Sequence, residues 1–390
     1  MEGFSHISFK KNWDYTKKSL YFLGQISSTI DAIAMTPLLP DYHKRLLLVS
    51  LQKGARATTA IEGNTLTEEE VGKVQAGESL PPSKEYQEIE VKNILEAYTK
   101  IRDEIIIKEK PDLISPKLIK HFNYLVGKEL NEHFGGTPGQ FRNCNVVVGS
   151  VYKAPNYEEV PQLVDSLCEF LKNEFHFDKG QKFGEAVIQA IITHVYIEWI
   201  HPFQDGNGRT GRLLEFYLLM RAGNPDIASH ILSNHYNNTK IEYYRQLDKA
   251  NKHGNLSEFI EYALLGFRDG LTSTIDIIQK NLFTIAWQKL VYDKFSDVNY
   301  RVVDVFKSKR CGLNIITIYP SLTIDEIFFY NPESAKKYAN LTDITLKREI
   351  DEFKNMELLI KVGNKYRANI SLLTKQSPLR KFTNKIYDGF

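Results

Sequence analysis

The sequence predicts a mainly α-helical protein with one small β-hairpin in its middle and a winged helix-turn-helix near its C-terminus. Apolar residues recur at helical spacing in most segments, which is typical of helices that bury one face. Short apolar or β-branched runs beside turn residues occur at 145–149 and 359–362. With 390 residues, 42% of them hydrophobic, the chain can bury a core and form two or three domains.

Turn and capping residues divide the N-terminal part into helices. Pro37 and Pro40 separate two segments with helical periodicity. Residues 61–64 interrupt the second of these, and Thr67 with Glu70 forms the capping-box pattern that starts a new helix. The helices expected in this part span residues 13–30, 42–59 and 85–108.

The middle of the chain combines helices with the small hairpin. Ser115 followed by Pro116 is typical of a helix N-terminus, and apolar residues continue from it at helical spacing. The β-branched run from Asn145 to Gly149, followed by Tyr152, predicts the hairpin. Further helices are expected at 158–175, at 183–200 and from about Gly208 onward.

The C-terminal part predicts a helix followed by a tight hairpin, the outline of a winged helix-turn-helix. Leu346, Ile350 and Phe353 lie on one face of the helix, and Gly363-Asn364 forms the turn of the hairpin. The chain is therefore expected to have three regions: an N-terminal helical region at 1–110, a catalytic core at 111–270, and a linker helix with the winged-helix domain at 271–390.

The C-terminal region carries a basic surplus. Residues 331–390 hold 12 Lys and Arg residues against 7 Asp and Glu residues, a net charge of +5. Contacts with DNA phosphates are one reading of this surplus. Docking of another protein is the alternative, because acidic residues directly follow Lys347 and Arg348 and a mixed-charge face is usually only solvated.

Composition predicts a soluble cytoplasmic protein with no membrane partner. The whole chain is nearly neutral, with 50 basic and 48 acidic residues. Cys144, Cys168 and Cys311 are widely spaced and odd in number, which indicates reduced thiols. The N-terminus lacks the apolar run of a signal peptide. The longest apolar stretch, 187–200, is interrupted by Gln189, His194 and Glu198 and is too short to span a membrane.

Residues 201–212, with the sequence HPFQDGNGRTGR, carry the chemistry. Pro202 places His201 at the end of the preceding helix, where orphan carbonyls can orient an imidazole and favour its protonated form. A histidine placed in this way can act as a general base toward a hydroxyl. His194, seven residues earlier, is expected to pack in the core.

The second half of the motif predicts a phosphate site. Gly206 and Gly208 flank Asn207 where a new helix begins, so free N–H groups can bind an anion. Arg209 and Arg212 follow three residues apart and can project toward one pocket. Asp205 adds a carboxylate suited to Mg²⁺ beside phosphate oxygens. Together these groups predict phosphoryl or nucleotidyl transfer, whereas a glycine-rich helix start with only local hydrogen bonds is the structural alternative.

The motif resembles the signature of the Fic family, HPFx(D/E)GNGRxxR, and the resemblance covers roughly residues 45–265. It implies a protein adenylyltransferase: His201 would deprotonate a Ser, Thr or Tyr hydroxyl of a protein, which attacks the α-phosphate of ATP. Asp205 would bind Mg²⁺, Gly206, Asn207, Gly208 and Arg209 would hold the phosphates, and Arg212 would lie near the γ-phosphate. Tyr243, Tyr244 and Asn251 would line the adenine pocket, although tyrosines at helical spacing more often belong to a core.

Two further segments resemble parts of that family. Val146, Val147, Val148 and Gly149 fall where the family carries its flap, a hairpin that aligns a target segment by strand addition. Residues 58–64 resemble the inhibitory-helix motif (S/T)xxxE(G/N), with Thr58 and Glu62 at its defining positions. Glu62 would pair with Arg212 and block the γ-phosphate, and an anion at a helix C-terminus gains from such a cation.

Several functions stay open from the sequence. The main alternative is a DNA-binding regulator whose Fic-like domain senses nucleotides. The same fold could also remove AMP from targets or transfer phosphate or phosphocholine. Ligand binding or a change of oligomeric state, such as homodimer formation, could release Glu62, and self-modification is also open. The target protein, the modified residue type and the trigger are not encoded in recognisable motifs.

Overall fold

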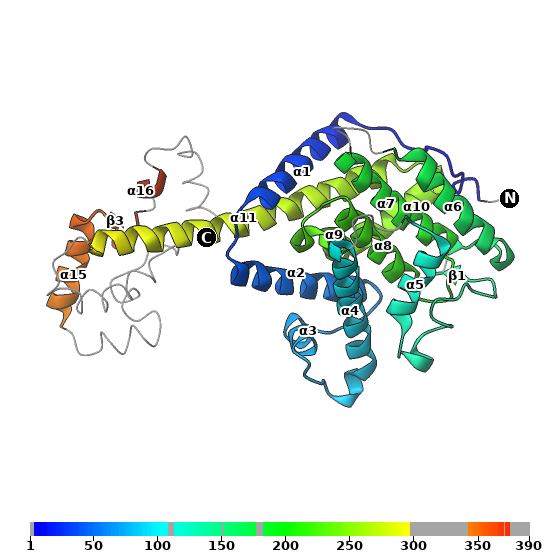
Figure 1. Ribbon diagram of the computed structural model, residues 1–390, viewed down its shortest axis with the longest axis horizontal. Coiled ribbons are helices and arrows are strands. Elements are labelled where there is room, and N and C mark those ends of the chain that lie inside the picture. The colour runs from blue at the N-terminus through cyan, green and yellow to red at the C-terminus, as the bar shows by residue number, and fades with distance from the viewer. Residues whose placement is uncertain are drawn as a thin grey trace. The chain divides into compact units, whose positions relative to one another are not determined.

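The structure of the protein is a computed structural model, and it describes residues 4–107, 113–149, 152–176, 182–296, 342–369 and 371–374. The chain divides into two compact units, Met1–Ile275 and Asp276–Phe390. The predicted mainly α-helical class is confirmed, since two small antiparallel hairpins are the sheets formed by the described residues (Figure 1).

The first unit holds the helices and the hairpin around the predicted site. Its longer elements are α1 (Lys17–Met35), α2 (Pro40–Ile61), α3 (Glu68–Gln75), α4 (Glu85–Ile107), α5 (Pro116–Gly127), β1 (Val147–Val148), β2 (Tyr152–Lys153), α6 (Val160–Glu174), α7 (Lys182–Ile200), α8 (Asn207–Arg221), α9 (Ile231–Asn238), α10 (Lys240–His253) and the first part of α11 (Ser257–Ser296). Short 3₁₀ turns are η1 (Pro82–Lys84), η2 (Asn131–His133), η3 (Tyr157–Glu159) and η4 (Asp226–Ala228).

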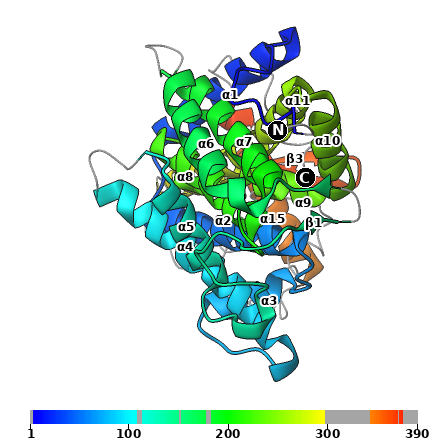
Figure 2. The same ribbon diagram turned by 90° about the vertical axis from the view of Figure 1, so that its right-hand side faces the viewer.

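The core of this unit forms around α7 and α8, which share the most extensive contact between any two helices. α8 is buried from Asn207 to Met220, and most of α7 is also buried. Helices that are buried on all sides need neighbours on all sides. α2, α4 and α5 pack against α8, while α1 and α6 pack against α7; α6 and α7 lie side by side in Figure 2. The motif at 201–212 therefore joins the two central helices.

Local start signals agree with the structure in two helices. Thr67 and Glu70 form the reciprocal hydrogen bonds of a capping box at α3. Ser115 caps α5 by accepting a hydrogen bond from the N–H of Leu118, and Pro116 is the first residue of that helix. These contacts are local, which is why spacing alone predicts them. α2 begins at Pro40, two residues before its predicted start, because proline suits the first turn of a helix and belongs here to α2 instead of to the join.

The start predicted for the first helix was wrong by four residues. α1 begins at Lys17, and Thr16 caps it by accepting a hydrogen bond from the Ser19 N–H. Before it the chain crosses the helical core without forming a helix. Trp13 stacks on Phe175 with 6.0 Å between ring centroids, and the carbonyl of Asn12 accepts a hydrogen bond from the N–H of Leu256 at 3.0 Å. These tertiary contacts override the helical pattern of the segment.

The described part of the second unit contains a helix followed by a hairpin, as predicted. α15 (Asp343–Asn355) leads to β3 (Leu359–Val362) and β4 (Lys365–Ala368), which pair antiparallel, and α16 (Ser371–Thr374) follows. Gly363 adopts a positive φ of 61° in the turn, a conformation that glycine permits. The complete winged helix-turn-helix stays a prediction, because residues 297–341 and Cys311 lie outside the described residues.

Two further expectations concern cysteines and membranes. Cys144 and Cys168 are free thiols, as the cysteine spacing predicted. Among the helices of the described ranges, none has the length and apolar content that a membrane crossing requires.

Truncating a leucine in α8 should destabilise the first unit strongly. Leu214 has no exposed surface, so Leu214→Ala should lower the free energy of unfolding by about 2–5 kcal/mol through lost burial and a residual cavity. Leu20 on α1 is 57% exposed, and Leu20→Ala is the matched control, with an expected change within about 0.5 kcal/mol. Urea unfolding followed by circular dichroism measures both, and equal effects would contradict the central place of α8.

Candidate active site

His201 lies directly after the last residue of α7 and has an unusual backbone conformation. Its φ is +49°, which is rare for a residue other than glycine. Its N–H donates to the carbonyl of Ile197 at 2.9 Å, and its carbonyl accepts a hydrogen bond from Arg142 Nε at 2.8 Å. Strained backbone of this kind persists only where surrounding contacts fix it, and it is typical of functional sites.

The protonation state of His201 differs from the sequence expectation. The helix end was expected to favour the protonated imidazole, but burial of the ring lowers its pKa to about 4. Desolvation of this half-buried ring is the largest effect, and it outweighs the Glu198 backbone hydrogen bond and the Glu62 and Asp205 carboxylates, which raise the pKa. His201 is therefore neutral near pH 7, the state in which an imidazole accepts a proton.

The glycine loop between α7 and α8 is fixed by side-chain amides. Asn207 both donates to the carbonyl of Phe203 and accepts from its N–H, each at 2.9 Å. From α5, Asn123 donates to the carbonyl of Asp205 at 3.0 Å. A Cβ atom on Gly206, whose φ is 76°, would lie 3.1 Å from three side-chain atoms of neighbouring residues. The loop therefore requires glycine there, and the side chain of Asn207 shapes the loop from within.

Two adjoining cavities open beside this loop. The smaller, of about 150 Å³, is lined by His201, Asp205, the start of α8 (residues 206–208) and Arg212. The larger, of about 640 Å³, is lined by Tyr244, Asn251 and residues of the hairpin, and its size is typical of a small-molecule site. Glu62, Val148, Glu198 and Tyr244 line both. The structure thus brings most of the predicted site residues together.

Arg212 is buried and bound to the end of α2. Its Nε donates to Thr58 Oγ1 at 2.7 Å, and its Nη2 donates to Glu62 Oε1 at 2.5 Å and to the carbonyl of Thr58 at 3.0 Å. Burial alone would lower the pKa of Arg212, but the adjacent Glu62 carboxylate raises it above its ordinary value. Burial would likewise raise the pKa of Glu62, and Arg212 lowers it. Both groups are therefore charged, and each compensates the other.

Gly208 explains why this ion pair fits. A Cβ atom at that position would collide with Glu62 Oε1 and would lie 2.9 Å from Arg212 Nη1. The absence of a side chain on Gly208 therefore leaves the space in which the carboxylate meets the guanidinium.

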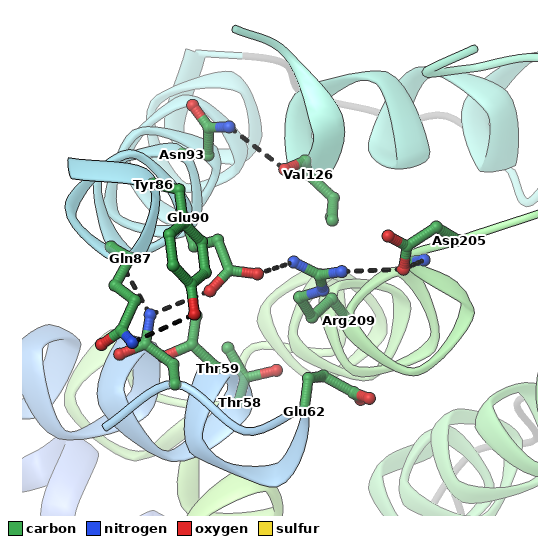
Figure 3. Close-up of polar contacts among 12 residues, drawn as sticks. Thr58, Thr59, Glu62, Tyr86, Gln87, Glu90, Asn93, Val126, Asp205 and Arg209 are labelled. Carbon is green, nitrogen blue, oxygen red and sulfur yellow. Dashed lines mark hydrogen bonds and ion pairs between the residues drawn. The ribbon is translucent and has the colours of Figure 1, made fainter. Parts of the chain in front are cut away.

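Arg209 is placed differently from Arg212. Its Nη1 lies 2.5 Å from Glu90 Oε1 and its Nη2 lies 2.9 Å from Asp205 Oδ1, so the guanidinium joins two carboxylates (Figure 3). Arg209 is buried and is not among the described residues that line the two cavities. Its predicted contact with phosphate stays a prediction, whereas its contact with Asp205 is direct.

Asp205 fits a magnesium ion that arrives with a nucleotide. Its Oδ1 accepts hydrogen bonds from Gly206 N and Arg209 Nη2, and its Oδ2 accepts one from Gly135 N at 3.2 Å. Among the described residues, no group of three or more His, Cys, Asp or Glu side chains could hold a metal by itself. A single oriented carboxylate completed by phosphate oxygens and water is the environment that Mg²⁺ prefers.

The hairpin lies against the larger cavity. Val148 pairs with Tyr152 and Val147 with Lys153, and the carbonyl of Val146 accepts a hydrogen bond from the N–H of Ala154 at 3.3 Å. Val148 and Gly149 line the cavity, while Val147 is 61% exposed. Tyr152 fixes the hairpin to α7 by donating to the carbonyl of Trp199 at 2.7 Å.

Residues 113–219 match the model of the Fic/DOC family. The chain carries a Fic/DOC family domain. Protein adenylyltransferase Fic of Nematostella vectensis is 29% identical over 206 residues, which are 53% of this chain and 44% of that protein. Protein adenylyltransferase fic-1 of Caenorhabditis elegans is 28% identical over 209 residues, 53% of this chain and 37% of that protein. The match thus spans less than half the length of these relatives.

Solved structures share the fold of the Fic domain and its surroundings. A Fic family protein from Desulfovibrio desulfuricans superposes with a TM-score of 0.58 at 20% identity, covering 92% of this chain and 98% of that chain. Fic-1 from C. elegans superposes with a TM-score of 0.55 at 23% identity, covering 67% of this chain and 73% of that chain. At these identities the likeness supports the fold and not the chemistry.

The two predicted adenine-pocket tyrosines of the Fic domain separate in the structure. Tyr244 is 47% exposed and lines both cavities, and Asn251 lines the larger one. Tyr243 is buried, and its hydroxyl lies 2.7 Å from His194 Nε2. His194 is fully buried, as expected for a core histidine, and burial lowers its pKa well below the ordinary value. Tyr243 therefore meets the core expectation as well as touching the smaller cavity.

Sequence reasoning missed Glu198 as a residue of the Fic site. It lies three residues before His201 on α7 and lines both cavities. The Tyr243 hydroxyl is 3.4 Å from its Oε1. Burial, followed by the nearby Glu62 carboxylate, raises the pKa of Glu198 to about 7. The available signal was that Glu198 interrupts the apolar stretch 187–200. Burying a carboxylate in a helix is costly unless it is paired or hydrogen-bonded, so such a residue indicates a functional or structural role.

Glu198→Gln should change the dependence of stability on pH. A carboxyl whose pKa rises from 4.5 to about 7 on folding binds its proton more tightly in the folded state, so stability is lost as pH rises through this range. Glu198→Gln has no titrating group at this position and lacks this loss. Its free energy of unfolding, relative to that of the unsubstituted protein, should therefore increase by about 2 kcal/mol between pH 5 and pH 8. Urea titrations at both pH values measure the difference.

The matched control is Glu78→Gln in an exposed loop, for which no such growth is expected. A constant difference between Glu198→Gln and the unsubstituted protein at the two pH values would contradict the assignment.

Proposed function

We propose that the protein is an adenylyltransferase that moves AMP from ATP to a hydroxyl side chain of another protein. The observation that carries the proposal is the small cavity in which a neutral imidazole, a carboxylate, the N-terminus of α8 and Arg212 meet. It joins a larger cavity of about 640 Å³, enough for a base and sugar. The names of the adenylyltransferase relatives support the same reaction.

His201 is the general base in this proposal. Its neutral ring takes the proton from a Ser, Thr or Tyr hydroxyl as the hydroxyl oxygen attacks the α-phosphate of ATP. A bond forms between that oxygen and the α-phosphorus, the bond to the bridging oxygen breaks, and pyrophosphate leaves. The proton remains on His201 until solvent removes it. Burial supports this role because it keeps the ring unprotonated at neutral pH.

The start of α8 would hold the phosphates. The helix begins at Asn207, directly beside the small cavity, and its first N–H groups and positive dipole end favour anions. Arg212 adds a fixed guanidinium at the same end, where charge on the leaving pyrophosphate develops. Asp205 would hold Mg²⁺ together with phosphate oxygens, and the ion would neutralise phosphate charge when bound.

The flap would present the target. Val147 is exposed on the short hairpin, whose neighbours Val148 and Gly149 line the larger cavity. Main-chain hydrogen bonds from such a hairpin align an extended segment with little choice of side chain. Recognition of the target would then depend on surfaces beyond the flap.

Glu62 would restrain the reaction. Its carboxylate accepts a hydrogen bond from the Arg212 guanidinium, the group that a γ-phosphate would need, and it fills the space beside Gly208. A nucleotide must displace an ion pair in which Arg212 is buried and the Glu62 side chain is 34% exposed. Leaving the buried guanidinium without a replacement partner is unfavourable. An inhibited state populated at about 99:1 corresponds to roughly 2.7 kcal/mol, which ligand binding or a change of oligomeric state can supply.

Glu62→Gly should raise AMP transfer, by about 100-fold if the restrained state is populated at 99:1. Transfer is measured with ATP labelled at the α-phosphate, using cell lysate as the source of target proteins. Intact-mass spectrometry of a labelled protein identifies the group by its added mass. Equal transfer by the unsubstituted protein and Glu62→Gly would rule out the restraint.

His201→Ala should abolish transfer in the Glu62→Gly background, because it removes the general base of the proposed reaction. His253→Ala, an exposed substitution near the end of α10, is the matched control and should leave transfer unchanged. Full activity of the His201 variant would overturn the proposed reaction.

A further inference from the structure

We propose that Glu90 of α4 is a positioning residue that sets the metal-binding carboxylate of Asp205 by holding Arg209. The inference rests on the proposed function, since it concerns Mg²⁺ bound together with ATP. Glu90 lies 115 residues before Asp205 in sequence, outside the motif. Its role follows from the contacts that converge on Arg209.

The guanidinium of Arg209 uses its two terminal nitrogens on two carboxylates. Nη1 lies 2.5 Å from Glu90 Oε1, and Nη2 lies 2.9 Å from Asp205 Oδ1. Figure 3 shows Arg209 between the two acidic side chains, with the three groups in one line. The Arg209 side chain is 5% exposed, so solvent screens these pairs weakly. The orientation of Asp205 is thus coupled to the position of Glu90.

The second oxygen of Glu90 is bound to the turn after α2. Asn64 Nδ2 donates to Glu90 Oε2 at 2.9 Å and to the carbonyl of Gln87 at 3.0 Å. Asn64 Oδ1 accepts a hydrogen bond from the N–H of Leu66 at 3.0 Å. Both Glu90 oxygens therefore have fixed partners on different segments, and the carboxylate cannot turn away from Arg209 without breaking one of these contacts.

Sharing the charge of Arg209 matters for Mg²⁺. One guanidinium carries a single positive charge, and two carboxylates divide it in this arrangement. Without the charge of Glu90, the whole cation would be compensated by Asp205, which would then attract Mg²⁺ less strongly. Groups that orient and tune a metal ligand in this way commonly change metal affinity or activity by about 10–100-fold when they are substituted.

The same turn is connected to both arginines of the motif, directly to Arg212 and through Glu90 to Arg209. Glu62 binds Arg212 directly, and two residues later Asn64 reaches Arg209 through Glu90. The end of α2 is thereby connected to the γ-phosphate end of the site and to its metal end.

The test compares Glu62→Gly with the double variant Glu62→Gly, Glu90→Gln. Calorimetry measures the Kd of a non-hydrolysable ATP analogue with and without Mg²⁺, and Mn²⁺ binding is followed by electron paramagnetic resonance. We expect the Mg²⁺ concentration for half-maximal binding and transfer to rise about 10–100-fold in the double variant, with metal-free nucleotide binding nearly unchanged.

Glu96→Gln is the matched control. Glu96 lies on the same helix and its Oε2 is 2.5 Å from Lys128 Nζ, outside the site, so its loss should leave the Mg²⁺ dependence unchanged. If Glu90→Gln fails to fold, Glu90→Asp is used instead, because it keeps the negative charge on a side chain shorter by one methylene. A smaller increase in the Mg²⁺ concentration for half-maximal binding is then expected.

The possible failures are distinguishable. Unchanged Mg²⁺ and Mn²⁺ dependence in folded Glu90 variants, or an equal shift in Glu96→Gln, would overturn the positioning role while leaving the transferase intact. Metal-dependent nucleotide binding without any transfer to protein would overturn the proposed activity, and the effect of Glu90 on metal binding would still be measured.

Discussion

The buried guanidinium of Arg212 is the constraint on which the rest of the site depends. A charge in the core must be compensated, and Thr58 and Glu62 at the end of α2 supply a hydroxyl, a carbonyl and a carboxylate for it. That requirement fixes the end of α2 against the start of α8. The charge of Arg212 also acts on Glu198, whose pKa burial would otherwise raise further.

Burial of α8 along its length extends this constraint through the core. A helix without a solvent face must pair its polar side chains internally, and α8 does so with partners from distant segments. Glu215 accepts a hydrogen bond from the Tyr236 hydroxyl, while burial raises the pKa of Glu215 well above its ordinary value. His194 and Tyr243 form a second buried pair beside it. These two buried polar pairs therefore connect α8 with α9 and α7 with α10 inside a mainly apolar core.

Local patterns were enough to predict the class of the fold, most helix positions and the glycine loop between α7 and α8. The motif kept its functional groups within twelve consecutive residues, so proximity in sequence implied proximity in space. The features that the sequence did not predict depend on contacts between residues far apart along the chain. Glu90 meets Arg209 from 119 residues away, and the segment around Trp13 is held extended by helices formed much later in the sequence. Contacts between distant segments produce no periodic pattern in the sequence, so spacing could not predict them. The burial that keeps His201 neutral also has no sequence pattern.

In the proposed function, restraint by Glu62 and phosphate binding are consequences of the same geometry. A cavity that presents a helix N-terminus and a buried arginine to a polyphosphate leaves an uncompensated cation whenever the phosphate is absent. Glu62 meets that need at the position where Gly208 leaves space, so in the proposed function the carboxylate would compensate Arg212 in the resting protein and compete with the nucleotide for the same guanidinium. Strengthening the anion site for ATP would also strengthen its hold on Glu62. The balance between the two would therefore be set by groups that act more on one than on the other. The Arg209 guanidinium contacts Glu90 and Asp205 directly, whereas it acts on Glu62 through its charge.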